Sequence, residues 1–204
     1  MRHLFFTLAA TLTLAAAGNA ATLTLDNSTL YGMPNDIVGF GGTITSTPDY
    51  TYDNGNTPFL VITSADFVVN PGTYPVGVFT PIIAQNYIVI GPDEGNGEVN
   101  PYDASFDLSQ NTGIGSYQIN SFQSIGDEAT GQIVLTYDEY SVSPLDNSFD
   151  PATDGLAYGQ ILSADATVIV GSAPAAAVPE SSTTLLAGLG LIGSVLFRRY
   201  RFGS

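Results

Sequence analysis

Residues 162–170 read Leu-Ser-Ala-Asp-Ala-Thr-Val-Ile-Val, and this stretch indicates the fold class. Apolar side chains occupy every second position from Leu162 to Val170, with Ser163, Asp165 and Thr167 between them. Successive side chains of a β-strand point to opposite faces, so a period of two is typical of a strand with one buried and one exposed face. Residues 162–170 therefore predict a strand that covers a hydrophobic core.

Similar patterns recur throughout the chain before residue 171. Alternation or short apolar runs predict further strands at residues 22–25, 37–44, 59–69, 75–80, 87–90, 116–122 and 133–138. In the segment 59–69 the residues expected on one face are Phe59, Val61, Ala65, Phe67 and Val69. Gly, Pro, Asn and Asp clusters separate the strands, and no segment before residue 183 keeps a helical period. We therefore expect an all-β domain, a β-sandwich with either Ig-like or jelly-roll connections.

The N-terminus has the pattern of a secretion signal. A basic start at residues 1–3 precedes an uncharged apolar run, residues 4–17, and small residues at Gly18 and Ala20. The run is too short to span a bilayer core of ~30 Å comfortably. We expect a signal peptide at residues 1–20, an ectodomain at residues 21–172 and a small-residue linker at residues 173–177.

Charge and composition exclude several functions. Residues 21–177 contain 18 Asp and Glu side chains and no Lys or Arg. Nucleic acids and anionic lipids are recognised through Lys and Arg, so neither is an expected partner. The one histidine is His3 and there is no cysteine. Nucleophilic triads, His/Cys zinc sites and disulfides are therefore excluded, and we expect a domain that is not an enzyme.

The C-terminal tail changes character at Val178. The tetrapeptide Val178-Pro179-Glu180-Ser181 is followed by an uncharged apolar stretch up to Phe197. From Pro179 to Phe197 a helix would span ~28 Å at ~1.5 Å per residue, which predicts a transmembrane helix at residues 183–197. Basic residues stay on the cytoplasmic side, so the closing cluster Arg198, Arg199 and Arg201 places the ectodomain outside.

Residues 178–201 resemble the PEP-CTERM sorting signal of Gram-negative bacteria, which joins a Val-Pro-Glu-Pro-like tetrapeptide, an apolar helix and an arginine cluster. Val178, Pro179 and Glu180 match the tetrapeptide, whereas Ser181 departs from its second proline. The arginine cluster also matches. The resemblance implies that an exosortase, a membrane cysteine transpeptidase, recognises and processes the tail. An inner-membrane-anchored precursor would then become a cell-surface or extracellular protein.

Carboxylates are the strongest chemical groups of the ectodomain. Acidic clusters rich in Gly and Asn occur at residues 49–56, 93–107 and 146–154. Calcium binds carboxylate and carbonyl oxygens, so its candidate ligands are Asp93, Glu98, Asp150 and Asp154. The alternative is that these clusters are solvated loops that keep the surface soluble.

Tyrosine is the second notable group, with ten of eleven tyrosines in the ectodomain. Tyr50 and Tyr52, beside Asp53-Asn54, resemble a carbohydrate-binding loop in composition, although strands also favour tyrosine. We expect an exported surface or extracellular-matrix protein with a non-catalytic binding or structural domain that associates with polysaccharide. The alternatives are a calcium-binding adhesin-like module and a carboxylate-dependent glycan hydrolase. Asp138 and Glu139 cannot form the acid pair of such a hydrolase, because neighbours on a strand point to opposite faces.

Overall fold

The computed structural model describes residues 21–49 and 56–174. The chain divides into two units, Met1–Ala173 and Pro174–Ser204, and every described residue except Pro174 belongs to the first. The expected signal peptide, the sorting motif at Val178–Glu180, the helix at residues 183–197 and the arginine cluster lie outside the described residues, as do Tyr50 and Tyr52. Within the described ranges no helix is long and apolar enough to cross a membrane.

The described residues form strands and one short 3-10 helix, which confirms the all-β fold class. The elements are β1 (Ala21–Leu25), β2 (Thr29–Gly32), β3 (Ile37–Phe40), β4 (Gly42–Ser46), β5 (Phe59–Val69), β6 (Gly77–Pro81), η1 (Ile83–Gln85), β7 (Val89–Ile90), β8 (Tyr102–Ala104), β9 (Gly115–Ile119), β10 (Glu128–Tyr140) and β11 (Gly155–Val170).

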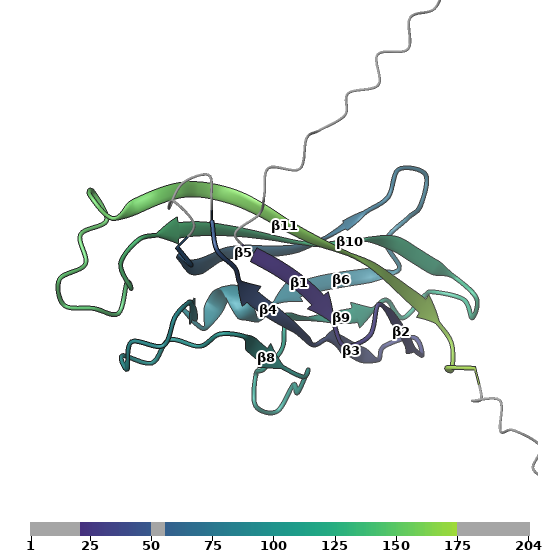
Figure 1. The fold of residues 1–204 in the computed structure, drawn as a ribbon. Coiled ribbons are helices and arrows are strands. Elements are labelled where there is room, and N and C mark those ends of the chain that lie inside the picture. The colour runs from purple at the N-terminus through teal and green to yellow at the C-terminus, as the bar shows by residue number, and fades with distance from the viewer. Residues whose placement is uncertain (1–20, 50–55, 175–204) are drawn as a thin grey trace, which may run out of the picture. The chain divides into compact units, whose positions relative to one another are not determined.

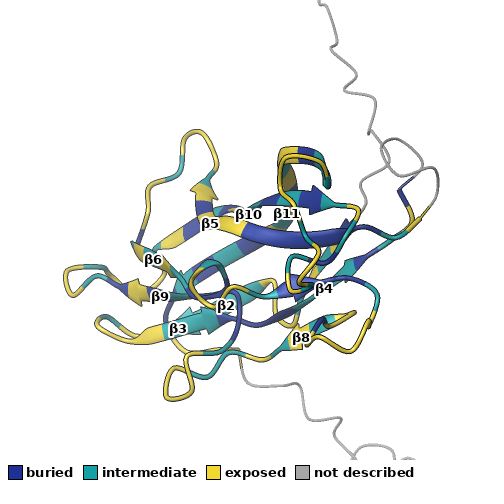
Figure 2. Cartoon of the chain, turned by 90° about the vertical axis from the view of Figure 1, so that its left-hand side faces the viewer, coloured by how far each residue is buried: buried dark blue, intermediate teal, exposed yellow. Residues whose placement is uncertain are grey.

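The strands form three sheets (Figure 1). The largest has the order β2-β11-β10-β5-β7, and the two three-stranded sheets have the orders β1-β4-β8 and β3-β9-β6. All pairs are antiparallel except β2 with β11, which run parallel. The long strands β10 and β11 belong to one layer of the domain. The two smaller sheets form a second layer that faces them (Figures 1 and 2).

The hydrophobic core lies between the five-stranded sheet and the two smaller sheets. Alternate residues of β10 and β11 point inward, as their period of two predicts. The same buried cluster takes Phe40 from β3, Ile44 from β4 and Tyr117 from β9. The inward-facing members from β10 and β11 are Ala129, Ile133, Leu135, Tyr137, Leu162, Ala166, Val168 and Val170.

The expected face of residues 59–69 is wrong in its first half. The register between β5 and β10 shifts at Thr63, because Ser64 pairs with Thr136 while Ile62 pairs with Tyr137. A residue inserted in this way reverses the alternation on one side of it. Leu60 and Ile62 therefore join Ala65 and Phe67 in the main core. Phe59 and Val61 instead pack with Val89 and Tyr140 in a second buried cluster.

The segment 37–44, expected as one strand, is divided between two sheets. β3 pairs with β9 and β4 pairs with β1, so the chain changes sheets at Gly41. A Cβ atom at Gly41 would lie 2.2 Å from Asp26 Oδ2 and 2.8 Å from the Phe106 nitrogen, so only glycine fits there. The short strands β2 and β8 were not expected from the sequence, since four and three residues are too few to show a period.

Candidate functional site

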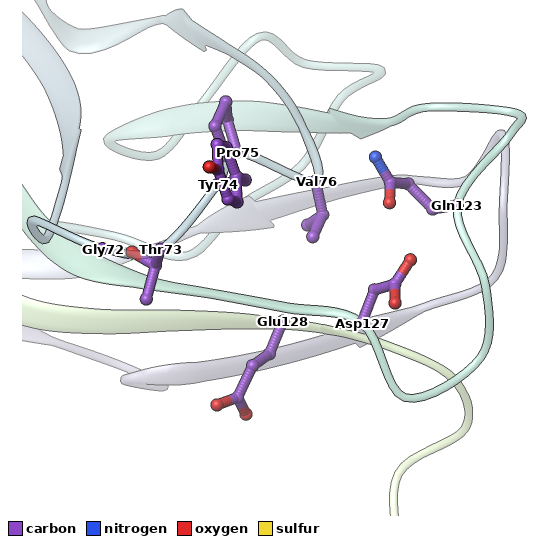
Figure 3. A pocket seen from close by; sticks show the side chains of 8 residues that line it. All are labelled: Gly72, Thr73, Tyr74, Pro75, Val76, Gln123, Asp127 and Glu128. Atoms are coloured by element: carbon purple, nitrogen blue, oxygen red, sulfur yellow. The ribbon is translucent and has the colours of Figure 1, made fainter.

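A groove of about 400 Å³ opens between the β5–β6 connection and the β9–β10 connection (Figure 3). Its lining combines one aromatic ring, one amide, two hydroxyls and two carboxylates. The lining residues are Gly72, Thr73, Tyr74, Pro75, Val76, Gln123, Asp127 and Glu128.

Turn chemistry shapes the wall made by residues 70–76. Gly72 has a φ of 90°, a left-handed conformation that glycine adopts without strain. The Asn70 N–H donates to the Thr130 carbonyl over 2.9 Å, and the Thr73 hydroxyl donates to the Asn70 carbonyl over 2.8 Å. These bonds fix the turn against the start of β10, which holds Tyr74 at the rim.

The opposite wall is a turn that ends where β10 begins. The Asp127 carboxylate accepts from the Ser124 N–H over 2.8 Å, and the Asp127 N–H donates to the Ser124 carbonyl over 3.0 Å. Gly126 donates to the Val170 carbonyl over 2.8 Å. The Asn120 N–H donates to the Val76 carbonyl over 3.0 Å and so links the two walls. Backbone hydrogen bonds, together with the Thr73 hydroxyl and the Asp127 carboxylate, thus hold both walls of the groove.

The side chains of the groove present a stacking surface beside polar groups. The Tyr74 side chain is 84% exposed, and Phe122, which precedes the groove residue Gln123 in the chain, is 78% exposed. Gln123 and Asp127 face each other, whereas the Glu128 side chain points away (Figure 3). An exposed aromatic face stacks on the apolar face of a ring, and the amide and carboxylate bind hydroxyl groups. This combination suits a polyhydroxylated ligand without negative charge.

Glu98, one of the candidate calcium ligands, is buried and bound by protein donors. One of its oxygens, Oε1, accepts from the Ser143 hydroxyl, and Oε2 accepts from the Asn96 N–H over 3.0 Å and the Glu94 N–H over 3.4 Å. The hydrogen bond from Ser143 is the main cause that lowers the pKa of Glu98 to about 2. Glu98 therefore links the 91–100 loop to the 141–154 loop.

The other three candidate ligands lie in the same two loops. Asp93 accepts from the Gly95 N–H over 3.0 Å, and Asp150 accepts from the Ala152 N–H over 2.9 Å. Asp154 accepts from the Asp150 N–H over 2.7 Å, so these two lie together. In residues 21–49 and 56–174, no three His, Cys, Asp or Glu side chains lie close enough to hold a metal. Calcium binding stays a prediction that the structure does not test.

The sequence did not single out a buried acid pair, Asp49 and Glu139. Their side chains are 1% and 2% exposed. Glu139 points inward while the Asp138 carboxylate lies on the other face and accepts from the Gly159 N–H over 2.9 Å. The available signal was the alternation of β10, which makes Glu139 the next inward residue after Leu135 and Tyr137. Asp49 carried no such signal, since it lies outside the named strands.

Comparisons with known proteins give little guidance. No protein-family model and no curated protein matches the chain. A solved structure described as "AvmM Catalyzes Macrocyclization in Alchivemycin A Biosynthesis" is similar over 78% of this chain and 91% of that chain, with 12% identity and a TM-score of 0.27.

This comparison corrects the expectation that the domain is not an enzyme. AvmM is a catalyst by its description, and the expectation that this domain is not an enzyme is withdrawn. The missing His, Cys, Lys and Arg side chains exclude particular reaction types, but carboxylates and tyrosines still supply acids and bases. At this identity and TM-score, the match assigns neither a fold nor a reaction to this chain.

Proposed function

We propose that this chain is an exported cell-surface or extracellular-matrix protein whose β-domain binds a neutral polysaccharide in the Tyr74 groove. The observation that carries the ligand class is the 84% exposed Tyr74 ring at the rim of a polar groove. Exposed aromatic rings are costly to solvate and are common where proteins bind ligands.

Charge supports a ligand that is neutral. Asp127 and Glu128 line the groove, and residues 21–177 contain no Lys or Arg to bind a phosphate, sulfate or carboxylate group. An anionic polymer would meet repulsion along the whole surface. A neutral glycan offers hydroxyl groups that both donate to carboxylates and accept from the Gln123 amide.

The targeting ends support export and sorting. The signal-peptide pattern at residues 1–20 and the PEP-CTERM-like tail at residues 178–201, with its helix at 183–197, together describe a chain that an exosortase would anchor and process. We further propose that the two layers of sheets form a β-sandwich, which agrees with a core enclosed between β10–β11 and the smaller sheets.

Affinity electrophoresis of the purified full-length chain in gels that contain neutral or anionic polysaccharides tests the ligand class. We expect retardation by at least one neutral polysaccharide and none by anionic ones. An aromatic ring that packs on another ring contributes roughly 0.5–1.5 kcal/mol beyond the area that it buries, so Tyr74→Ala should weaken binding about fivefold. Release of new reducing ends is measured in the same samples, because it distinguishes hydrolysis from binding.

Tyr158→Ala is the matched control, since Tyr158 is an exposed tyrosine of β11 whose ring contacts Tyr140, the last residue of β10. It should leave retardation unchanged. Equal binding by wild type and Tyr74→Ala, or binding only to anionic polymers, would contradict the proposal.

A further inference from the structure

Asp49 and Glu139 bring two carboxyl groups together inside the fold. Glu139 lies on the inward face of β10, and Asp49 is held by an antiparallel bridge in which its N–H donates to the Asn56 carbonyl over 2.7 Å. Both side chains are at most 2% exposed, as is Tyr137, the preceding inward residue of β10. The pair is therefore shielded from bulk water.

The groups that face Glu139 include no cation. Its carboxyl group forms side-chain hydrogen bonds with Asp49 and with Tyr137. The residues paired with Glu139 on the neighbouring strands are Leu60 of β5 and Ala157 of β11, which carry no charge. Residues 21–49 and 56–174 contain no Lys, Arg or His. A hydrogen bond between two carboxyl groups requires a proton on one of them.

The surroundings of one Glu139 oxygen atom are consistent with a protonated carboxyl group. Among the described residues, Glu139 Oε2 is buried without a hydrogen-bond partner. An ionised carboxylate oxygen that is buried without a donor is far more costly than the oxygen of a neutral carboxylic acid. The geometry therefore favours a neutral Glu139 in the folded protein.

We propose that Glu139 keeps its proton in the folded protein through its hydrogen bond with Asp49, and that loss of this proton as the pH rises weakens the fold. The pKa of Glu139 is raised from 4.5 to about 7, first by burial and then by the charge of Asp49. A group whose pKa rises on folding stabilises the native state below its unfolded pKa. This contribution is thus complete below about pH 4.5 and is lost as the pH rises through about 7.

Thermal unfolding of the full-length chain at about pH 5 and about pH 8 tests the proposal. Measurements in roughly 0.5 M NaCl screen the surface carboxylates and leave the buried pair largely unscreened. We expect the wild-type Tm to fall by roughly 5 °C between the two pH values. Glu139→Gln keeps the shape and is always neutral, so it should remove most of this fall. Glu128→Gln, an exposed glutamate on the same strand, should not.

An infrared measurement on the wild type keeps the proposal testable if Glu139→Gln does not fold. A carbonyl band of a protonated carboxylic acid should persist near pH 6 and disappear near pH 8, where surface acids are already ionised. Absence of that band, or an unchanged pH dependence in Glu139→Gln, would overturn the proposal.

Discussion

Glu98 and Glu139 show how the same buried side chain can be charged or neutral. Three donors, the Ser143 hydroxyl and two backbone N–H groups, surround the Glu98 carboxylate and stabilise its charge. Glu139 lies beside another carboxyl group and has one oxygen without a partner, so its neutral form is favoured. The hydrogen bond from Ser143 is the main cause that lowers the pKa of Glu98, whereas burial and then the charge of Asp49 raise the pKa of Glu139.

Ser143→Ala should raise the pKa of Glu98 from about 2 toward its ordinary value, because Ser143 is the main cause of the lowering. A lowered pKa stabilises the fold above about pH 4.5, and this stability is lost as the pH falls through about 2. The acid midpoint of unfolding should therefore move to a higher pH in this variant, which circular dichroism can follow.

Ser109→Ala is its control, since Ser109 donates an equivalent but solvent-exposed hydrogen bond to Asp107, which is half-buried. A midpoint that moves equally in both variants would show that the buried bond has no special role.

At the scale of elements, β10 organises the domain. It pairs with β11 along one side and with β5 along the other, and its inward residues reach from Ala129 to Glu139. The same alternation that fills the core with apolar groups ends on Tyr137 and Glu139. One strand therefore carries the centre of the core, the edge of the Tyr74 groove and half of the buried acid pair.

Leu135→Ala tests this alternation. Leu135 is fully buried at the centre of β10, so the change should lower the free energy of unfolding by about 2–5 kcal/mol. Val134→Ala, on the opposite face of the same strand, should cost less than about 1.5 kcal/mol. Denaturant titration measures both, and equal losses would contradict the assignment of the two faces.

At the scale of the whole molecule, charge is uncompensated. Residues 21–177 carry 18 carboxyl groups and no Lys or Arg, so their repulsion is reduced only by solvent, ions and backbone donors. Repulsion among these carboxylates weakens at mildly acidic pH, and Glu139 is then protonated, so both effects stabilise the fold there. At lower pH the fold loses the stability that the ionised Glu98 contributes. The structure therefore links maximal stability to pH values below neutral.

Deletion of residues 178–201 tests the sorting role of the tail. The truncated chain lacks the tetrapeptide, the apolar stretch and the arginines, so it should leave the membrane fraction and appear in the soluble periplasmic or culture fraction. Ser181→Pro, which keeps all three parts, should distribute as the wild type does. Immunoblots of fractionated cells measure both, and a truncated chain that stays with the membranes would contradict the sorting role.

The local sequence pattern was sufficient to predict the fold class and most strands of this protein. The faces of β10 and β11 follow from alternation, because side-chain direction in a strand is a local property. The strand pairing, the phase reversal at Thr63, the change of sheets at Gly41 and the short strands β2 and β8 needed the tertiary structure. These features depend on which strand lies alongside, and no local pattern encodes a neighbour that is distant in sequence. The Tyr74 groove and the Asp49–Glu139 pair depend on tertiary structure for the same reason, since each joins residues about 50 to 90 positions apart.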